Sequence, residues 1–265
     1  MPPKHVPDSF RLIEEVFQLT YQNGSYFECT SERVQVSSLD FYSGKPSDND
    51  EQFIRTFPSG QMRQLLEEVR PWDNPDGCPS VLPIDNEVDD AAQARDLWNA
   101  FRSHLSINRD GNAPGIIQNT DWKLVVPRDT NLLFRLTRHL PWNVETFFDQ
   151  CNPAKPHIGC YLANHIPLKE TTLCTSEIQT ILWTIGCRLM DEKYQNHSII
   201  PVTFLSGTKS SVRIVQGFID DCRILKVQLT PVIDFSGGER SRWEQFIQML
   251  CWVVGEPVGN TVRML

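Results

Sequence analysis

Residues 199–230 read IIPVTFLSGTKSSVRIVQGFIDDCRILKVQLT. Three runs rich in β-branched residues, 199–205, 212–219 and 223–230, are separated only by two short polar links. Links this short suit antiparallel neighbours, so the stretch predicts a three-stranded meander. In the last run the apolar residues Leu225, Val227 and Leu229 alternate with Lys226 and Gln228, which predicts one apolar and one polar face of the sheet.

Two helices are expected to cover this sheet, near residues 176–193 and 241–254. In the first, apolar residues recur at helical spacing behind Ser176, which pairs with Gln179 in a capping-box pattern. The second follows Ser241 and ends at Gly255. The fold class predicted from these patterns is α+β, with a helical N-terminal portion packed on a C-terminal antiparallel sheet of three to five strands.

Charge and periodicity divide the chain near its middle. Residues 1–132 carry 21 acidic and 12 basic side chains, a net charge of −9. We expect residues 1–150 to form a mainly helical, acidic portion and residues 151–265 an α+β domain. Whether the two form one compact unit stays open.

Several segments of the N-terminal portion have individual expectations. Asn143 is expected to cap a helix over 144–151, and Thr130 a helix that stops before Pro141. Residues 71–86 hold four prolines and predict a connector without regular structure. Residues 37–58 show no helical or strand-like spacing of apolar residues, which predicts a loop or a partly ordered insertion.

Composition excludes several classes of protein. No run of about 18 apolar residues exists, and the start lacks the apolar core of a secretory signal. We therefore expect an intracellular protein, cytoplasmic or nuclear, that is neither secreted nor bound in a membrane. The net charge of −8 argues against nucleic acid as a partner, and leaves protein as the expected one.

Motifs for common cofactors are missing from the sequence. It contains no G-x-G-x-x-G, no G-x-x-x-x-G-K-[ST], no H-E-x-x-H and no G-x-S-x-G. No cofactor is predicted on this basis. The eight cysteines are too dilute for a disulfide scaffold and are interpreted as reduced core residues.

One local enrichment suggests an alternative with structural zinc. Three cysteines and two histidines lie within residues 151–174, and four of them could supply nitrogen and thiolate ligands: His157, Cys160, His165 and Cys174. Their spacing is irregular, with no C-x-x-C, so a core or hydrogen-bonding role is favoured for them.

Acidic residues suggest two further alternatives. The run from Asp73 to Asp96 is interpreted as a solvated loop and helix start, with a divalent-cation site or a docking face for a basic partner as the alternative. Glu177, Asp220, Asp221 and Lys226 resemble the acidic pair and lysine of some nucleases, but the aspartates are more simply a turn.

The C-terminal part resembles a group of uncharacterised proteins from filamentous ascomycete fungi. The resemblance covers about residues 157–261 and rests on these segments: YLANHIPL (161–168), CTSEIQT (174–180), YQNH (194–197), IPVT (200–203), RIVQG (213–217), TPVIDF (230–235) and PVGNT (257–261). It implies a fungal origin and a shared C-terminal fold, and it transfers no catalytic residue.

Two functions remain after these exclusions. The favoured one is a non-catalytic interaction or regulatory protein. The alternative is an enzyme of unrecognised type, with its site where the sheet meets the helix that starts near Ser176. Its acid, base or binding groups would be His165, Glu177, Arg213 and Lys226, the ionisable residues nearest that junction.

Overall fold

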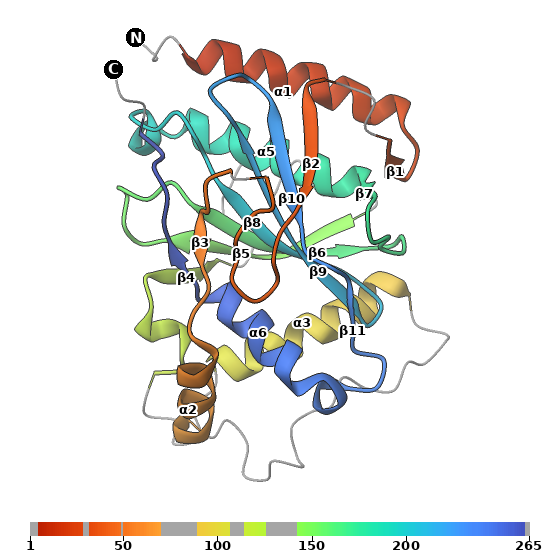
Figure 1. The fold of residues 1–265 in the computed structure, drawn as a ribbon, viewed down its shortest axis with the longest axis vertical. Coiled ribbons are helices and arrows are strands. Elements are labelled where there is room, and N and C mark those ends of the chain that lie inside the picture. The colour runs from red at the N-terminus through yellow and green to blue at the C-terminus, as the bar shows by residue number, and fades with distance from the viewer. Residues whose placement is uncertain are drawn as a thin grey trace.

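A helix–sheet–helix sandwich, seen in a computed structural model, is the architecture of the chain (Figure 1). The structure describes residues 5–28, 32–48, 50–69, 89–106, 114–125 and 142–262. Its centre is a mixed eight-stranded sheet with the order β2-β10-β9-β8-β6-β5-β4, and β11 pairs with β9 beside this path. One helical layer lies on each face of the sheet.

The strands of the central sheet come from both halves of the chain. They are β2 (Val34–Ser38), β4 (Trp122–Val125), β5 (Trp142–Gln150), β6 (Ile158–Asn164), β8 (Val202–Thr208), β9 (Ser211–Ile219), β10 (Leu225–Leu229) and β11 (Ile233–Asp234). Two small antiparallel pairs flank this sheet, namely β1 (Tyr26–Phe27) with β7 (Leu173–Cys174), and β3 (Ile54–Arg55) with β12 (Glu256–Pro257).

The fold class predicted from the sequence is wrong. Strands β8, β9 and β10 pair antiparallel, but they are part of a larger mixed sheet rather than a three-stranded meander. Strand β6 is parallel to β8, and β2 is parallel to β10. The first 150 residues do not only pack on this sheet, because they also contribute β2, β4 and β5 to it.

Parallel pairing of β6 and β8 follows from helix α5 (Thr175–Met190), which lies between them in the sequence. A helix that crosses over a sheet returns the chain to the edge where it started, so the second strand runs in the direction of the first. The short links of the sequence predict pairing only within residues 199–230 and leave β6 without an expected partner.

Strand β5 occupies residues for which a helix over 144–151 was expected. A β-bulge between Val144 and Thr146 shifts the register against β6. As a result Val144 and Phe147 pack in the same core cluster, although they are three residues apart. A bulge therefore imitates helical spacing within a strand.

The upper layer in Figure 1 consists of α5 and α1 (His5–Gln22). Val16 of α1 and Ile181 of α5 are completely buried in one cluster with Phe204 and Val227 of the sheet. The two helices are antiparallel, since Thr20 near the end of α1 accepts a hydrogen bond from Gln179 near the start of α5.

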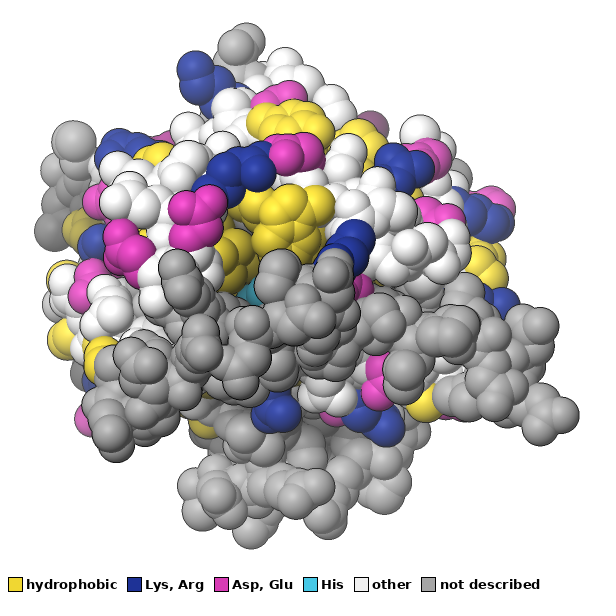
Figure 2. All heavy atoms as spheres, turned by 90° about the horizontal axis from the view of Figure 1, so that it is seen from below, with side chains coloured by type: hydrophobic (Ala, Val, Ile, Leu, Met, Phe, Trp, Pro, Cys, Tyr) yellow, Lys and Arg dark blue, Asp and Glu magenta, His cyan; other side chains and the backbone are white. Residues whose placement is uncertain are grey.

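The lower layer consists of α2 (Ser59–Val69), α3 (Asp90–Ser106) and α6 (Trp243–Val253). Trp98 of α3 stacks on Tyr161 of β6 with 5.1 Å between ring centroids, and its indole donates to Thr146 Oγ1. Figure 2 looks onto this layer from below, where apolar side chains gather between acidic and basic ones.

The unpatterned segment 37–58 covers part of this lower face. It contributes Phe41 and Phe53, both buried, and Phe53 packs on Phe218 of β9 with 4.7 Å between ring centroids. The proline-rich connector 71–86, the expected helix from Thr130 and most of the acidic run that begins at Asp73 lie outside the described residues. In the described part of the chain, no helix is long and apolar enough to cross a membrane.

Candidate functional site at the start of helix α5

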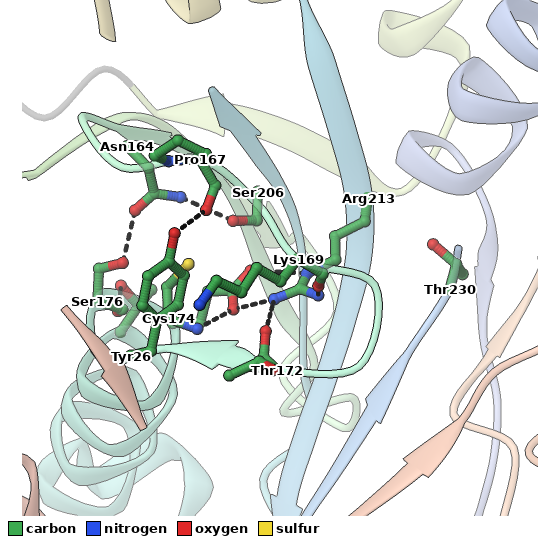
Figure 3. Close-up of polar contacts among 12 residues, drawn as sticks. Tyr26, Asn164, Pro167, Lys169, Thr172, Cys174, Ser176, Ser206, Arg213 and Thr230 are labelled. Carbon is green, nitrogen blue, oxygen red and sulfur yellow. Dashed lines mark hydrogen bonds and ion pairs between the residues drawn. The ribbon is translucent and has the colours of Figure 1, made fainter. Parts of the chain in front are cut away.

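The first turn of α5 lies at the carboxyl ends of the parallel strands β6 and β8. Ser176 in this turn donates to Asn164, the last residue of β6, with 2.5 Å between Oγ and Oδ1. Sheets with parallel strands and a crossover helix bind ligands at this kind of position. Polar side chains gather here on a face of the sheet that is otherwise apolar (Figure 3).

An ion pair between Arg213 of β9 and Glu177 of α5 is the centre of this cluster. Arg213 Nε donates to Glu177 Oε1 over 2.9 Å, and Nη2 donates to Glu177 Oε2. Both side chains have 0% exposure. Two parallel hydrogen bonds between a guanidinium and a carboxylate fix both groups in orientation as well as in charge.

The remaining contacts of Arg213 go to the loop 165–172, which follows β6. Nη1 donates to Lys169 O over 2.6 Å, and Nη2 donates to Thr172 O over 3.0 Å. Carbonyl dipoles therefore complete the environment of the cation. Figure 3 shows these bonds converging on the guanidinium from the loop.

Strand β1 holds the same loop from its other side. The Tyr26 hydroxyl donates to Pro167 O over 2.9 Å, and Lys169 Nζ lies 3.6 Å from the centroid of the Tyr26 ring. The loop is thus tied to β1 at its outer surface and to Arg213 at its inner surface.

Glu177 also caps the helix to which it belongs. Its Oε2 accepts from Cys174 N over 2.8 Å, so Cys174 is the N-cap residue and Glu177 the third residue of the helix. The predicted capping box of Ser176 with Gln179 is therefore wrong. The Ser176 hydroxyl bonds Asn164 instead, and the Gln179 amide bonds Thr20.

A second polar chain runs beside the ion pair. Asn164 receives the Ser176 hydrogen bond and donates from Nδ2 to Ser206 Oγ of β8 over 2.8 Å. Asn164, Ser176 and Ser206 are all buried. Asn164 and Ser206 are not among the site residues expected from the sequence. The alternation of β6 places Asn164 on the same face as Cys160 and Leu162, and a polar residue at that position was the available signal.

Burial and charge set the protonation states in the cluster. Burial opposes the charged form of Arg213, but the Glu177 carboxylate outweighs it, so the pKa of Arg213 lies above its ordinary value. Burial, together with the Glu177 charge, also raises the pKa of the Cys174 thiol. Cys174 is therefore a protonated thiol and a poor nucleophile.

The four predicted catalytic residues do not converge. Glu177 and Arg213 are paired, but His165 lies at the surface, with its Nδ1 3.0 Å from Asp89 Oδ1. Lys226 lies on the opposite face of the sheet, because its neighbours Leu225 and Val227 belong to the cluster under α1 and α5. Its Nζ is 3.5 Å from Asp50.

The nuclease-like arrangement is not assembled either. The sheet separates Lys226 from Glu177, and the Asp220 carboxylate accepts from Ile224 N within its own turn. Of the acidic run from Asp73, the described members include Asp89, which contacts His165, and Asp90, which is 3.4 Å from Lys209 Nζ.

The four predicted zinc ligands have separate environments. His157 Nε2 is 2.8 Å from Val258 O, Cys160 is buried in the apolar cluster, and Cys174 caps α5. His165 contacts Asp89 at the surface. Within the described ranges, no group of three or more His, Cys, Asp or Glu side chains could hold a metal ion.

Comparison with family models, with curated proteins and with solved structures finds no match. The polar cluster joins β9, α5, β1 and the loop 165–172, and the charges of Glu177 and Arg213 neutralise each other and are enclosed by the protein itself.

Proposed function

We propose that this chain is a non-catalytic interaction protein. The observation that carries the proposal is the Glu177–Arg213 pair, in which both side chains have 0% exposure and bond only groups of the protein. A catalytic acid, base or anion-binding group has to reach substrate atoms within about 3 Å. A pair enclosed in this way instead fixes the arrangement of the strand, helix and loop that it joins.

The contacts of the pair support the same reading. Arg213 bonds two carbonyls of the loop 165–172 as well as Glu177, so removing it would release the loop and leave a carboxylate buried. His165 and Lys226 each have a carboxylate partner away from the pair. The cluster therefore ties segments that are distant in the sequence into one framework, which suits a rigid binding module.

One observation favours an enzyme as the second candidate. The cluster lies at the carboxyl ends of parallel strands and at a helix start, where sheets of this kind hold active sites. In that case the loop 165–172 would have to leave Arg213 for a substrate to enter.

Two measurements on the purified protein and on its natural cell decide between the candidates. Proximity labelling followed by co-purification is expected to recover a protein partner in stoichiometric amount. Turnover of a small molecule by the purified chain that is lost in Ser176→Ala, with the fold retained by circular dichroism, would overturn the proposal.

The proposal places the protein inside a fungal cell, as the resemblance of residues 157–261 implies, and assigns it no metal. A fluorescent fusion is expected in the cytoplasm or nucleus, and its appearance in the culture medium would contradict this. Elemental analysis is expected to give less than about 0.1 zinc per chain, because structural zinc binds tightly enough to survive purification.

A further inference from the structure

Helix α5 leaves few side chains at the surface, and most of these are apolar. Along the whole helix, which the structure describes throughout, only Thr175, Trp183, Cys187 and Met190 are not buried. Three of the four are apolar, and Met190 is 53% exposed. The outward face of an ordinary surface helix carries charged and polar residues instead.

Helix α1 continues this apolar surface. Phe17 packs on Tyr21 with 5.6 Å between ring centroids, and on Trp183 of α5 with 6.5 Å. Tyr21 is 67% exposed. Phe10 lies against α5 at Gly186, one turn before Met190. We call the whole set the helix-pair stripe: Phe10, Phe17, Tyr21, Trp183, Cys187 and Met190.

Tyr21 and Met190 are exposed and the other four members are half-buried, and a partly exposed apolar cluster of this kind is typical of a protein-binding surface. Aromatic residues and methionine are enriched where proteins meet, whereas apolar residues scattered singly over a surface need no partner. The stripe spans two helices that pack side by side in the upper layer (Figure 1).

Unpaired charges beside the stripe have one sign. Glu14 lies between Phe10 and Phe17 along α1, and Glu192 follows Met190 by two residues. Both are exposed, and no ion pair is recorded for either within the described residues. The nearby Arg11, by contrast, is bound to Glu15 at 3.2 Å.

We infer that the helix-pair stripe binds an amphipathic helix of a partner protein whose apolar face is bordered by Lys or Arg. This inference rests on the proposed function. Two antiparallel helices form a surface onto which a third helix packs its apolar residues at i, i+3, i+4 and i+7. Glu14 and Glu192 then pair with the basic residues at its borders, and this charge complementarity sets specificity and association rate.

The same charges disfavour a second copy of this chain as the occupant. A symmetric contact between two stripes would bring Glu14 and Glu192 of one copy towards the same acidic residues of the other, and like charges across an interface are repulsive.

Site-specific photo-crosslinking in the natural cell tests the inference. The full-length protein carries benzoylphenylalanine in place of Tyr21. A matched control carries it in place of Tyr42, which is 59% exposed on the other side of the sheet and packs on Phe41 of the lower layer. Mass spectrometry of the crosslinked peptide identifies the partner segment.

The inference predicts a crosslink from position 21 to a helical segment with Lys or Arg beside its apolar residues, and none from position 42. Crosslinking from position 42 alone would overturn the stripe but leave the proposed function intact. Crosslinking from neither position would count against the proposed function itself. A crosslink from position 21 to another copy of this chain, or to an acidic segment, would overturn the partner class.

A peptide titration measures the charge preference directly. The probe is an 18-residue synthetic helix with leucines on one face and lysines at its borders, and the control peptide has glutamates in place of the lysines. By fluorescence anisotropy the lysine peptide is expected to bind at least about tenfold more tightly. The double variant Glu14→Lys/Glu192→Lys is expected to reverse this order, and equal affinity for both peptides would overturn the role of the two carboxylates.

Discussion

Arg213 of β9 and Glu177 of α5 form a bidentate ion pair, although neither side chain has any surface exposed to solvent. The pair joins the middle of the sheet to the crossover helix between β6 and β8. Through Lys169 O and Thr172 O it also holds the loop that covers the start of that helix.

Breaking this pair from one side is expected to be strongly destabilising. Arg213→Met leaves the Glu177 carboxylate buried without its counter-ion, which costs about 3–5 kcal/mol of unfolding free energy. Urea denaturation followed by circular dichroism measures the loss. Glu177→Leu is expected to lose a similar amount of unfolding free energy, because it leaves the Arg213 guanidinium buried without its counter-ion.

The double variant Arg213→Met/Glu177→Leu is the control for that experiment. With both charges removed, its loss is expected to fall short of the sum of the two single losses by at least about 2 kcal/mol. Additive losses would mean that the two residues do not act as a pair.

Gly159 of β6 is expected to tolerate no side chain. A Cβ there would lie 2.5 Å from Thr203 O and 2.8 Å from Phe148 Cδ2. Gly159→Ala should therefore lower the unfolding free energy by about 1–3 kcal/mol through overpacking. The matched variant Gly60→Ala, in the first turn of α2 with nothing within 4 Å of the added Cβ, should stabilise the protein by up to about 1 kcal/mol. Equal effects of the two substitutions would refute this packing.

Acid is expected to weaken the fold through His157. Burial, together with the charges of Lys155 and His197, lowers the pKa of His157 from 6.5 to about 4, despite its hydrogen bond with Val258 O. The folded state therefore favours the neutral ring. Its contribution is complete above about pH 6.5 and is lost as the pH falls towards 4, by about 3 kcal/mol in all.

His157→Gln isolates this effect, because glutamine keeps a donor for Val258 O and does not titrate. Unfolding free energies of both proteins at pH 7 and pH 4 give the comparison, in which carboxylates contribute equally to each. The wild-type protein should lose about 3 kcal/mol more than the variant between these pH values. Parallel pH profiles would show that His157 is not the group responsible.

Exposed cysteines should react faster with an alkylating reagent than buried ones. Cys151 and Cys222 are exposed, whereas Cys174 and Cys251 are buried, and burial raises the pKa of Cys251 to about 12. With iodoacetamide at pH 8, the exposed pair should be alkylated at least about tenfold faster, since only the thiolate reacts. Peptide mass spectrometry measures this, with denatured protein as the reference. Rapid native alkylation of Cys174 would contradict its assignment as a buried, protonated thiol.

The helices could be predicted from the sequence more closely than the sheet. The apolar spacing behind Ser176 predicts a helix near 176–193, and α5 spans Thr175–Met190. Its cap could not be predicted, because the choice of Cys174 with Glu177 depends on Arg213, which lies 36 residues from Glu177 in the sequence. Periodicity describes a single element, whereas capping here depends on tertiary contacts.

Strand direction was missed for a different reason. Ile158, Cys160 and Leu162 alternate with Gly159 and Tyr161 as in a strand. Together with the helix near 176–193 and the strand at 199–205 they form a strand–helix–strand unit, for which parallel pairing is the rule. The sequence therefore contains a signal for parallel pairing, but the short links within residues 199–230 favoured an antiparallel sheet. Strand β5 was predicted as a helix because its β-bulge gives the apolar residues a helical spacing, and no residue type in the segment indicates a bulge.

The topology expected from the sequence locates the candidate site, but it does not predict that the ion pair there is enclosed. Glu177 and Arg213 were both named from their nearness to the junction, and the structure brings them together. Their enclosure by the loop 165–172 could not be foreseen, because it depends on Tyr26, which lies 141 residues before Pro167.

Crosslinking from position 21 in the Arg213→Met/Glu177→Leu background tests most directly whether the buried pair serves the fold alone. Provided that circular dichroism shows the double variant folded, the account predicts the same partner crosslink, in similar yield, as in the protein with the pair intact. A folded double variant that no longer captures the partner would show that the pair takes part in the function itself, and would contradict the account.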